Sequence, residues 1–441
     1  MVKYKYKETD IEWLGKIPKH WKASRIKSIS KILKTGATPT TSKSEYFEDG
    51  TLPWYGPESF NGFMELSTPK KLLNVSAIED NEIRLFYKNS VFVVGIGATI
   101  GKVGIINEES SCNQQINVIT PYEWYEGKFV AYFLKIFENE IIKFSQFTTL
   151  PIFNQNQLGR LPLSLPPLPE QKAIADYLDK ACQRIDKIID IKQKQLENLQ
   201  GIRKAKIYHA VTVGINPVSE WKELKFNQIK EIPANWKLYR IKSIGKVKYG
   251  LGQPPNEMIG GLPIIRATNV YRGKIDTNNL LFVDPDDVPY ERDPVLRKDD
   301  IIVVRSGAYT ADSAIIPQEF DGSITGYDMV LRCNKNISAK FVAYALLSKY
   351  ILDDQLLLLS LRAAQPHLNR EELGNSRILL PDFNEQKLIA EHLDVVTEKI
   401  DKTIQNIKNQ ITTLQSYRKS LIHECVTGKK QVWDGIIEKV S

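Results

Sequence analysis

One glycine-rich stretch, Val94 to Lys102 (VGIGATIGK), has a composition that could bind a phosphate group. Its spacing fits neither GxGxxG nor GxxxxGK[ST], the patterns in which backbone N–H groups surround nucleotide phosphates. The corresponding stretch later in the chain, Val304 to Ala311 (VRSGAYTA), keeps Gly307 and Ala308 and loses the rest. We therefore expect a tight turn after a strand, with Lys102 placed to contact a phosphate, and not a nucleotide site.

Other spacings typical of catalysis are missing from the sequence. The five histidines occur in no HxE, HExxH or CxxC context, so a metal site is not expected. No Asn/Asp-Pro-Pro-aromatic tetrapeptide, which would indicate methylation of a base amino group, is present. Asp382, Glu385 and Lys387 resemble fragments of a PD…ExK nuclease site, but helix capping explains them, and the first copy of this segment has no matching aspartate. The sequence thus predicts a non-catalytic chain that holds no cofactor or metal.

Side chains suited to reading nucleic acid remain. Arginine pairs bidentately with guanine, asparagine or glutamine pairs with adenine, and lysine contacts phosphates. The candidates are Lys102, Asn113, Gln114, Gln115 and Asn154 in the first half of the chain, and Arg266, Asn269, Arg272, Arg305, Tyr309, Arg362 and Gln365 in the second. Arg266, Arg305 and Arg362 rank first, because arginine beside Tyr, Asn or Gln offers both charge and planar donors. The same polar runs are also typical of solvated loops.

Composition limits the classes of protein. The 441 residues are enough for two to three domains, and the net charge of +8, from 60 basic and 52 acidic residues, favours a polyanionic partner. Four widely spaced cysteines (Cys112, Cys182, Cys333 and Cys425) are typical of reduced, buried thiols in the cytoplasm. The polar start MVKYKYKETD and the lack of any apolar run near 18 residues argue against secretion and membrane spanning.

The elements that must position these residues occur twice. Glu170 to Thr212 matches Glu385 to Thr427 at an offset of 215 residues without a gap. The opening segments match at the same offset, including Trp21 with Trp236, which we expect to be buried anchors. Between these segments the match continues with small gaps, for example in the KFVAY motif that begins at Lys128 and again at Lys340.

Both copies of the 43-residue segment have the apolar spacing of a coiled coil, in which one stripe faces a partner helix. The expected contact residues are Leu178, Ile185 and Leu199 in the first copy, and Leu393, Ile400, Ile407, Leu414 and Leu421 in the second. Ile188, Leu196 and Ile202 continue the first stripe, Tyr417 adds to the second, and Lys192 breaks one position. The proline-rich LSLPPLPEQ suits the start of the first helix, and Asp382 with Glu385 has the spacing of a capping box at the second.

The fold class expected is α+β (mixed α/β), with a pseudo-two-fold internal repeat. Short β-type runs (90–94 and 300–304) alternate with helical ones (128–144 and 340–359). The expected segments are a first globular domain at 1–165, a first long helix at 166–214, a second globular domain at 215–379, a second long helix at 380–430 and a tail at 431–441. At ~1.5 Å per residue a 43-residue helix spans about 64 Å, so the second helix must return along the first as an antiparallel pair.

These motifs resemble the specificity subunit of type I restriction–modification enzymes. The residues that carry the resemblance are EWLGKIP near Glu12, LPPLPEQKAIADYLD, LLPDFNEQKLIAEHLD and the helix ends YHAVTVG and HECVTGK. The second copy departs from this pattern at Asn227, where NQIK replaces the EWLG of the first copy. The resemblance implies two target-recognition domains that each read half of a split DNA sequence. It also implies two modification subunits docked on the helices and restriction subunits, with partners that use S-adenosylmethionine, ATP and Mg.

Two hypotheses remain from the sequence. The first is a DNA-binding specificity subunit whose helix pair sets the distance between two half-sites, roughly 34–36 Å apart if they lie on one face of the duplex. The second is a coiled-coil scaffold that carries two protein-binding domains and has no DNA role. Salt-dependent affinity for DNA distinguishes them.

Overall fold

The structure of the protein is a computed structural model. The structure describes residues 4–433 except 12–13, 63, 139–140, 142–145, 148–150 and 361–365. The chain divides into two compact units, unit 1 (1–191 with 409–441) and unit 2 (192–408). Each unit contains one recognition domain and half of each long helix. The segments 166–214 and 380–430, expected from the sequence as long helices, are thus each shared between the two units.

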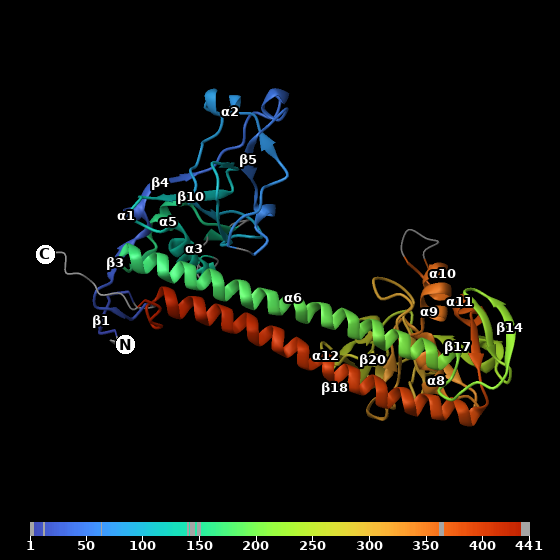
Figure 1. The fold of residues 1–441 in the computed structure, drawn as a ribbon. Helices are drawn as coiled ribbons and strands as arrows, with labels where there is room; N and C mark the ends of the chain where they lie inside the picture. Colours follow the sequence, from blue (N-terminus) through green and yellow to red (C-terminus); the bar gives the residue numbers. More distant parts are fainter. Residues whose placement is uncertain are drawn as a thin grey trace. The chain divides into compact units, whose positions relative to one another are not determined.

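The long helices are α6 (Leu168–Thr212) and α12 (Phe383–Val426) (Figure 1). Both begin two or three residues inside the segments expected from the sequence. In α12, the Asp382 carboxylate accepts hydrogen bonds from the N–H groups of Asn384 and Glu385 at 2.9 and 3.0 Å, which caps the helix. Glu385 does not complete the expected capping box, because its carboxylate accepts from the Trp236 indole N–H at 3.2 Å.

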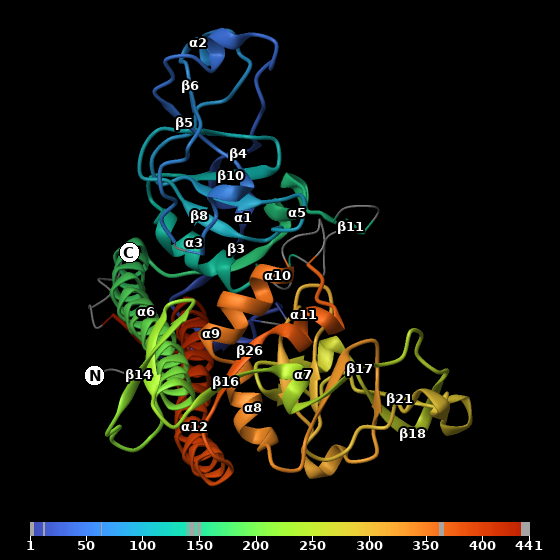
Figure 2. The ribbon, with the colours of Figure 1, turned by 90° about the vertical axis from the view of Figure 1, so that its right-hand side faces the viewer.

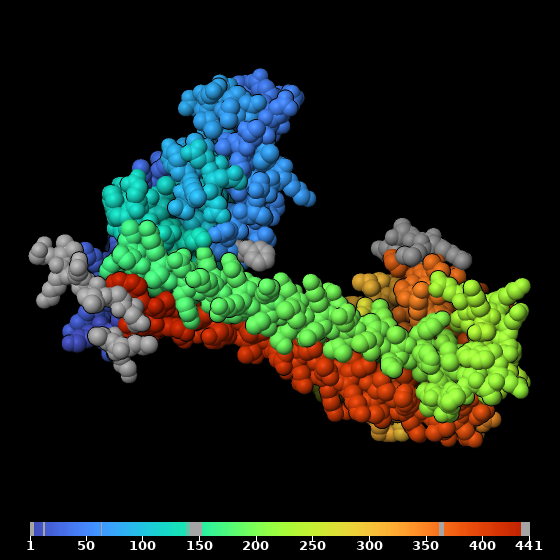
Figure 3. Space-filling view, in the orientation of Figure 1, coloured from blue at the N-terminus to red at the C-terminus, as the bar shows by residue number. Residues whose placement is uncertain are grey.

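The two long helices are antiparallel in each unit, and their green and red surfaces lie against each other (Figure 3). In unit 1 the Arg418 guanidinium lies 3.3 Å from the Asp186 carboxylate, and in unit 2 Arg203 lies 3.1 Å from Asp401. The two ion pairs join residues that are equivalent at the offset of 215. An early residue of one helix thus pairs with a late residue of the other, as the antiparallel coiled coil requires.

The apolar stripe is buried most deeply where a recognition domain also covers it. Leu178, Ile185, Leu393, Ile407 and Leu421 are buried, and Leu199, Ile400 and Leu414 are half-buried. Ile188, Ile202 and Tyr417 were placed in the stripe wrongly, because they are 43%, 49% and 53% exposed. Ile189 is buried in place of Ile188, because the straight helix drifts relative to a seven-residue repeat.

The centre of each recognition domain is a four-stranded antiparallel sheet. Its strand order in unit 1 is β4 (Ser30–Thr35), β10 (Ile116–Pro121), β7 (Val91–Val94) and β8 (Val103–Ile105). In unit 2 the order is β17 (Gly245–Tyr249), β25 (Met329–Cys333), β22 (Ile301–Val303) and β23 (Ser313–Ile315). The same order in both units confirms two copies of one α+β frame.

Both faces of each central sheet are buried, which explains the continuous apolar runs VFVV and IIVV. In unit 1, Val91 and Val93 belong to the core shared with α6 and α12, while Phe92 and Val94 belong to a core on the opposite face. Unit 2 repeats this alternation at residues 301–304. The sheet is therefore fixed between the helix pair and an outer layer.

The remaining elements flank these sheets. In unit 1 they are β1 (Tyr6–Glu8), β2 (Lys16–Pro18), β3 (Lys22–Arg25), α1 (Ile26–Ile29), β5 (Leu52–Tyr55), β6 (Leu72–Leu73), α2 (Ser76–Glu79), β9 (Ser111–Cys112), α3 (Gly127–Lys135), β11 (Gln146–Phe147), β12 (Pro151–Ile152), α5 (Gln155–Arg160) and β13 (Pro162–Leu165). In unit 2 they are β14 (Trp221–Phe226), β15 (Ile229–Pro233), β16 (Lys237–Arg240), α7 (Ile241–Ile244), β18 (Glu257–Ile265), β19 (Val270–Tyr271), β20 (Lys274–Ile275), β21 (Leu281–Val283), β24 (Ile324–Thr325), α8 (Ala339–Leu346), α9 (Lys349–Ile351), α10 (Leu358–Ser360), α11 (Arg370–Asn375) and β26 (Arg377–Leu380). Helices α7 to α9 pack with β26 into one core (Figure 2).

The helix expected at 340–359 is interrupted. It divides into α8, α9, a π-helical segment (Leu352–Leu357) and α10. Ser348 follows α8, and its hydroxyl donates to the backbone carbonyl of Ala345, a local bond that competes with helix continuation. The helix expected at 128–144 is α3 and ends at Lys135, while part of the expected range lies outside the described residues.

The duplicated sequence motifs join each recognition domain to its helices. Trp21 and Trp236 are fully buried, as expected. The Trp21 indole N–H donates to Glu170 at 3.1 Å, which is the same bond as Trp236 to Glu385. Gln171 follows Glu170 in the chain. Its side-chain amide N–H donates to the Pro166 carbonyl, and its side-chain oxygen accepts from the Glu126 N–H just before α3.

The KFVAY and LD motifs meet in the same way. In unit 1 the Asp179 carboxylate accepts from Lys128 at 2.8 Å and from the Tyr132 hydroxyl at 2.7 Å. In unit 2 the equivalent bonds run from Lys340 and Tyr344 to Asp394, at 2.7 and 2.8 Å. The repeated polar residues therefore attach each recognition domain to α6 or α12.

Candidate nucleic-acid interface

Strands β7 and β22 end in the same backbone turn. The N–H to carbonyl bonds of this turn are Val94 to Lys102 and Gly101 to Val94 in unit 1, and Val304 to Asp312 and Ala311 to Val304 in unit 2. Gly101 and Ala311, which are equivalent, both have positive φ, at 86° and 70°. The glycine-rich stretch is thus a tight turn after a strand, as the sequence predicts.

Gly95 and Arg305 occupy equivalent places at the start of this turn, and they differ in side chain but not in backbone hydrogen bonding. The Gly95 carbonyl accepts from the Phe153 N–H at 2.7 Å, and the Arg305 carbonyl accepts from the equivalent Leu368 N–H at 2.8 Å. A Cβ atom at Gly95 would lie 2.6 Å from the backbone carbonyl oxygen of Phe153, so unit 1 has no room for a side chain there. The two units therefore place glycine and arginine at the same point of one frame.

The Arg305 guanidinium lies against two tyrosine rings. Its central carbon is 4.4 Å from the ring centroids of both Tyr249 and Tyr327. The Arg370 guanidinium is 5.7 Å from the Tyr249 ring as well. Among the described residues, Arg305 Nε has no hydrogen-bond partner. We refer to Tyr249, Arg305 and Tyr327 as the tyrosine–arginine cluster.

The backbone beneath this cluster is held by a buried acid. The Asp328 carboxylate, which is 2% exposed, accepts from the Arg305 N–H at 3.0 Å. Burial raises the pKa of Asp328 to about 6, while backbone hydrogen bonds from Arg305 and Ala267 oppose the shift. The backbone N–H of Arg305 is thus used internally, and its guanidinium is left for other contacts.

The sequence did not single out Tyr249, Tyr327 or Arg370. The signal that could have found the tyrosines is the glycine beside each of them. A Cβ atom at Gly250 would lie 2.1 Å from the Gly326 carbonyl oxygen, so the two strands approach closely at this point. That approach brings the adjacent tyrosines to the same arginine.

The turn after β22 adds further aromatic surface. Tyr309 and Tyr271 are exposed, and their ring centroids lie 6.5 Å apart in an edge-to-face arrangement. The exposed Arg272 guanidinium carbon lies 5.4 Å from the Tyr271 centroid. Arg272 and Tyr309, both predicted from the sequence, are therefore joined through Tyr271.

Arg266 and Asn269 serve mainly to shape their loop. An Arg266 guanidinium N–H donates to the Asn279 carbonyl at 3.0 Å. Asn269 is fully buried, accepts from the Arg266 N–H at 3.2 Å and donates to the Asp276 carbonyl at 3.0 Å. Because its amide is buried and used on both sides, we remove Asn269 from the candidate DNA-contact residues.

The candidates of unit 1 form a smaller amide-rich loop. Asn113 donates to the Gln115 side-chain oxygen at 3.1 Å and accepts from the Gln115 N–H at 3.0 Å. The exposed Gln114 accepts a hydrogen bond from the Thr38 hydroxyl. The structure thus brings Asn113, Gln114 and Gln115 together beside Thr38, with Gln114 the most accessible of the three.

Two other candidates of unit 1 make structural contacts. Asn154 caps α5, and its side-chain oxygen accepts from the N–H groups of Asn156 and Gln157. The half-buried Lys102 ammonium donates to the Phe60 carbonyl at 3.3 Å. Asn154 is therefore explained by capping, as an alternative to base contact. Arg362 and Gln365 of unit 2 lie outside the described residues.

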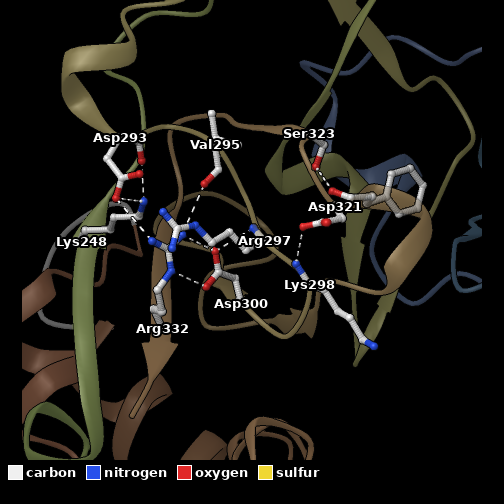
Figure 4. Close-up of polar contacts among 10 residues, drawn as sticks. Lys248, Asp293, Val295, Arg297, Lys298, Asp300, Asp321, Ser323 and Arg332 are labelled. Carbon is white, nitrogen blue, oxygen red and sulfur yellow. Dashed lines mark hydrogen bonds and ion pairs between the residues drawn. The ribbon is translucent and has the colours of Figure 1, made fainter. Parts of the chain in front are cut away.

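Other cations near the central sheet of unit 2 are neutralised by carboxylates (Figure 4). Arg332 pairs bidentately with the buried Asp300, at 2.8 and 2.7 Å. Lys248, the neighbour of Tyr249, lies 2.8 Å from the Asp293 carboxylate. These ion pairs hold the loop before β22 in place. Lys248 and Arg332 are consequently poor candidates for contact with DNA.

The described part of the chain holds no group of three or more His, Cys, Asp or Glu side chains that could bind a metal ion. No helix in this part of the chain is long and apolar enough to cross a membrane. The thiols of Cys112, Cys182 and Cys425 are buried, and burial raises the pKa of each.

A repeated frame with different polar side chains at equivalent loops, attached to a shared helix pair, defines a two-domain recognition protein. The model of the type I restriction modification DNA specificity domain matches residues 18–200 and 233–413. The chain belongs to this family and carries its domain twice. Members of the family are the non-catalytic DNA-recognition subunits of type I restriction–modification systems, and nothing supports the scaffold alternative.

Similar proteins span nearly the whole chain. The type I restriction enzyme MjaIX specificity subunit of Methanocaldococcus jannaschii is 25% identical over 446 residues, which cover 98% of this chain and 99% of the relative. The EcoBI specificity subunit of Escherichia coli is 23% identical over 347 residues, with 76% and 73% covered.

Two solved structures share the fold. One comes from work on assembly and conformational transition of the type I R-M system, with a TM-score of 0.71, 14% identity and coverage of 94% of this chain and 99% of that one. The HsdS subunit from Thermoanaerobacter tengcongensis has a TM-score of 0.50 and 15% identity, with 94% and 98% covered.

Proposed function

We propose that this chain reads a split duplex DNA sequence, with one half-site for each unit. The observation that supports this most is the exchange at one point of the repeated frame, Gly95 in unit 1 and Arg305 in unit 2. Equal frames hold the two loops in the same way, while different side chains select different bases. Gln114 with its neighbours would act for unit 1, and Arg305, Arg272 and Tyr309 for unit 2.

The partners we propose are two copies of a modification subunit, together with restriction subunits. Ile202 and Tyr417 support two equivalent docking points, because they are equivalent at the offset of 215 and are 49% and 53% exposed. Exposed apolar side chains at equivalent positions of the two helices would suit contact with two copies of one partner. The modification partner would use S-adenosylmethionine to methylate adenine N6, and the restriction partner would use ATP and Mg. This chain would contribute recognition alone, in the cytoplasm.

We further propose that the helix pair sets the gap between half-sites. Helices α6 and α12 contain 45 and 44 residues. Each is about 66 Å long at ~1.5 Å per residue. The ion pairs Asp186–Arg418 and Arg203–Asp401 fix the register of the helices in their own units.

Competitive binding tests the proposal. The chain, assembled with its modification subunits, should bind one split DNA sequence more tightly than unrelated duplexes by roughly 10³-fold or more. Its affinity should fall steeply as salt rises, because phosphate contacts release counterions. Equal affinity for all duplexes at every salt concentration would contradict a reading function.

A further inference from the structure

The tyrosine–arginine cluster has a geometry that simple charge attraction does not require. A phosphate contact needs a cation and tolerates a mobile side chain. In unit 2 the Arg305 guanidinium is instead oriented by contacts with two rings, each centred 4.4 Å from its central carbon. Its backbone is fixed on both sides by Asp328 and by Leu368. A planar donor group is thus presented in one orientation.

The cluster is accessible, and the acid beneath it, Asp328, is buried and bonds the Arg305 backbone. Tyr249 is 38% exposed and Tyr327 is 44% exposed, so both rings reach solvent beside the arginine. Among the described residues the Arg305 Nε atom has no hydrogen-bond partner, whereas the Arg332 guanidinium in the same unit is bidentate to Asp300. Two parallel donors in fixed orientation match the O6 and N7 acceptors of guanine in the major groove.

We propose that Arg305 reads a single guanine in the half-site of unit 2, and that Tyr249 and Tyr327 are positioning residues that set this specificity. The inference rests on the proposed function. It adds which base is read, which atoms of that base are contacted and which two side chains orient the arginine. Unit 1 has Gly95 at the equivalent point, with no space for a side chain, so the same reading cannot occur in its half-site.

Base analogues test which atoms are read. Each guanine of the bound sequence is replaced in turn by 7-deazaguanine, which lacks the N7 acceptor, or by inosine, which keeps N7 and O6. For the assembled wild-type complex we expect one guanine at which 7-deazaguanine weakens binding by about 5- to 150-fold. Inosine at that position should change affinity by less than about twofold.

Variants of the full chain test which residues are responsible. Arg305→Lys keeps the charge and loses the paired planar donors, so it should abolish the 7-deazaguanine effect at that position and leave the salt dependence nearly unchanged. Tyr327→Leu should reduce the effect, and Tyr327→Phe, which keeps the ring, should retain it. Tyr290→Leu is the matched control, since Tyr290 is 51% exposed and lies outside the cluster.

The outcomes separate the two proposals. If wild type selects one sequence but no guanine is sensitive, or Arg305→Lys leaves the 7-deazaguanine effect at full size, Arg305 does not read guanine N7 and the inference is wrong. If Tyr327→Leu behaves as Tyr290→Leu does, the positioning role is wrong. If wild type selects no sequence at all, the proposed function itself fails.

Discussion

Two equivalent glutamates attach the recognition domains to their helices, but in different surroundings. Glu170 is fully buried and accepts from Trp21, His20 and Tyr4, whereas Glu385 is half-buried and accepts from Trp236 and Asn235. If a weaker acceptor replaced the buried Glu170 carboxylate, no water could reach these three donor groups to compensate for the weaker hydrogen bonds.

We therefore expect Glu170→Gln to lower the free energy of unfolding of unit 1 by about 2 kcal/mol, and Glu385→Gln to lower that of unit 2 by about 1 kcal/mol. Urea unfolding monitored by tryptophan fluorescence measures both. Equal losses for the two variants would show that burial does not determine the strength of this contact.

Asp328 gives unit 2 a dependence on pH. Its pKa is raised to about 6 by burial, above the value of about 3.9 in an unfolded chain. The folded protein thus holds this proton more tightly than the unfolded one. The resulting stability is complete below pH ~4 and is lost as the pH rises through about 6.

Asp328→Asn should therefore become more stable relative to wild type as the pH rises. The difference in free energy of unfolding between the variant and wild type should change by up to ~3 kcal/mol between pH 4 and pH 7. Chemical denaturation at several pH values gives this difference. A difference between variant and wild type that is constant with pH would contradict a raised pKa.

At the residue scale, prediction from the sequence succeeded where burial or backbone geometry decides. The anchoring tryptophans and the turn after each strand followed from residue type and duplication. For Asn154 and Asn269 the sequence could not separate the two roles, because an amide suits capping and loop bonding as well as base contact. Tyr249 and Tyr327 were missed because they are 78 residues apart in sequence and meet through the close approach of Gly250 and Gly326.

The long helices show how far periodicity alone can predict. It placed both helices within a few residues of their ends, and it identified Leu178 and Leu393 as contact residues. It failed at Ile188 and Ile202, because an apolar residue near the seam can still point outward.

Leu421 is buried in the core that α12 shares with the first recognition domain. Charged substitutions at Leu414 and Leu421 would thus damage unit 1 itself and are a poor test of docking.

Exposed residues of the helices provide a better test. Ile202→Lys together with Tyr417→Lys should greatly weaken assembly with the modification subunits, because a lysine in an apolar contact must be desolvated. Co-purification and mass measurement give the stoichiometry. Val395→Lys is the matched control, since Val395 is 53% exposed and its equivalent in the first helix is already Lys180. Normal assembly of the double variant would place docking elsewhere.

At the scale of the whole molecule, the helix pair should act as a spacer. One heptad is inserted after Gln193 and another after the equivalent Lys408. Both points lie between the ion pairs Asp186–Arg418 and Arg203–Asp401, so the contacts near each recognition domain are kept. Seven residues add about 10 Å of helix, or about three base pairs of rise.

The active complex with both insertions should therefore recognise the same two half-sites with a gap longer by about three base pairs. Sequencing the sites it methylates gives the gap directly. An unchanged gap in a complex that still methylates DNA would contradict the spacer. A single insertion is the control, since it shifts the register of the helix pair and should impair assembly.

The central claim is that each unit reads its own half-site. It is tested by measuring competitive binding of the assembled complex to duplexes altered one base pair at a time, for wild type, Arg305→Ala and Gln114→Ala. We predict that Arg305→Ala changes discrimination only at base pairs of one half-site, by about 1–3 kcal/mol, and that Gln114→Ala changes it only in the other. If either variant altered both half-sites equally, the units would bind DNA as one composite surface and the account would be wrong.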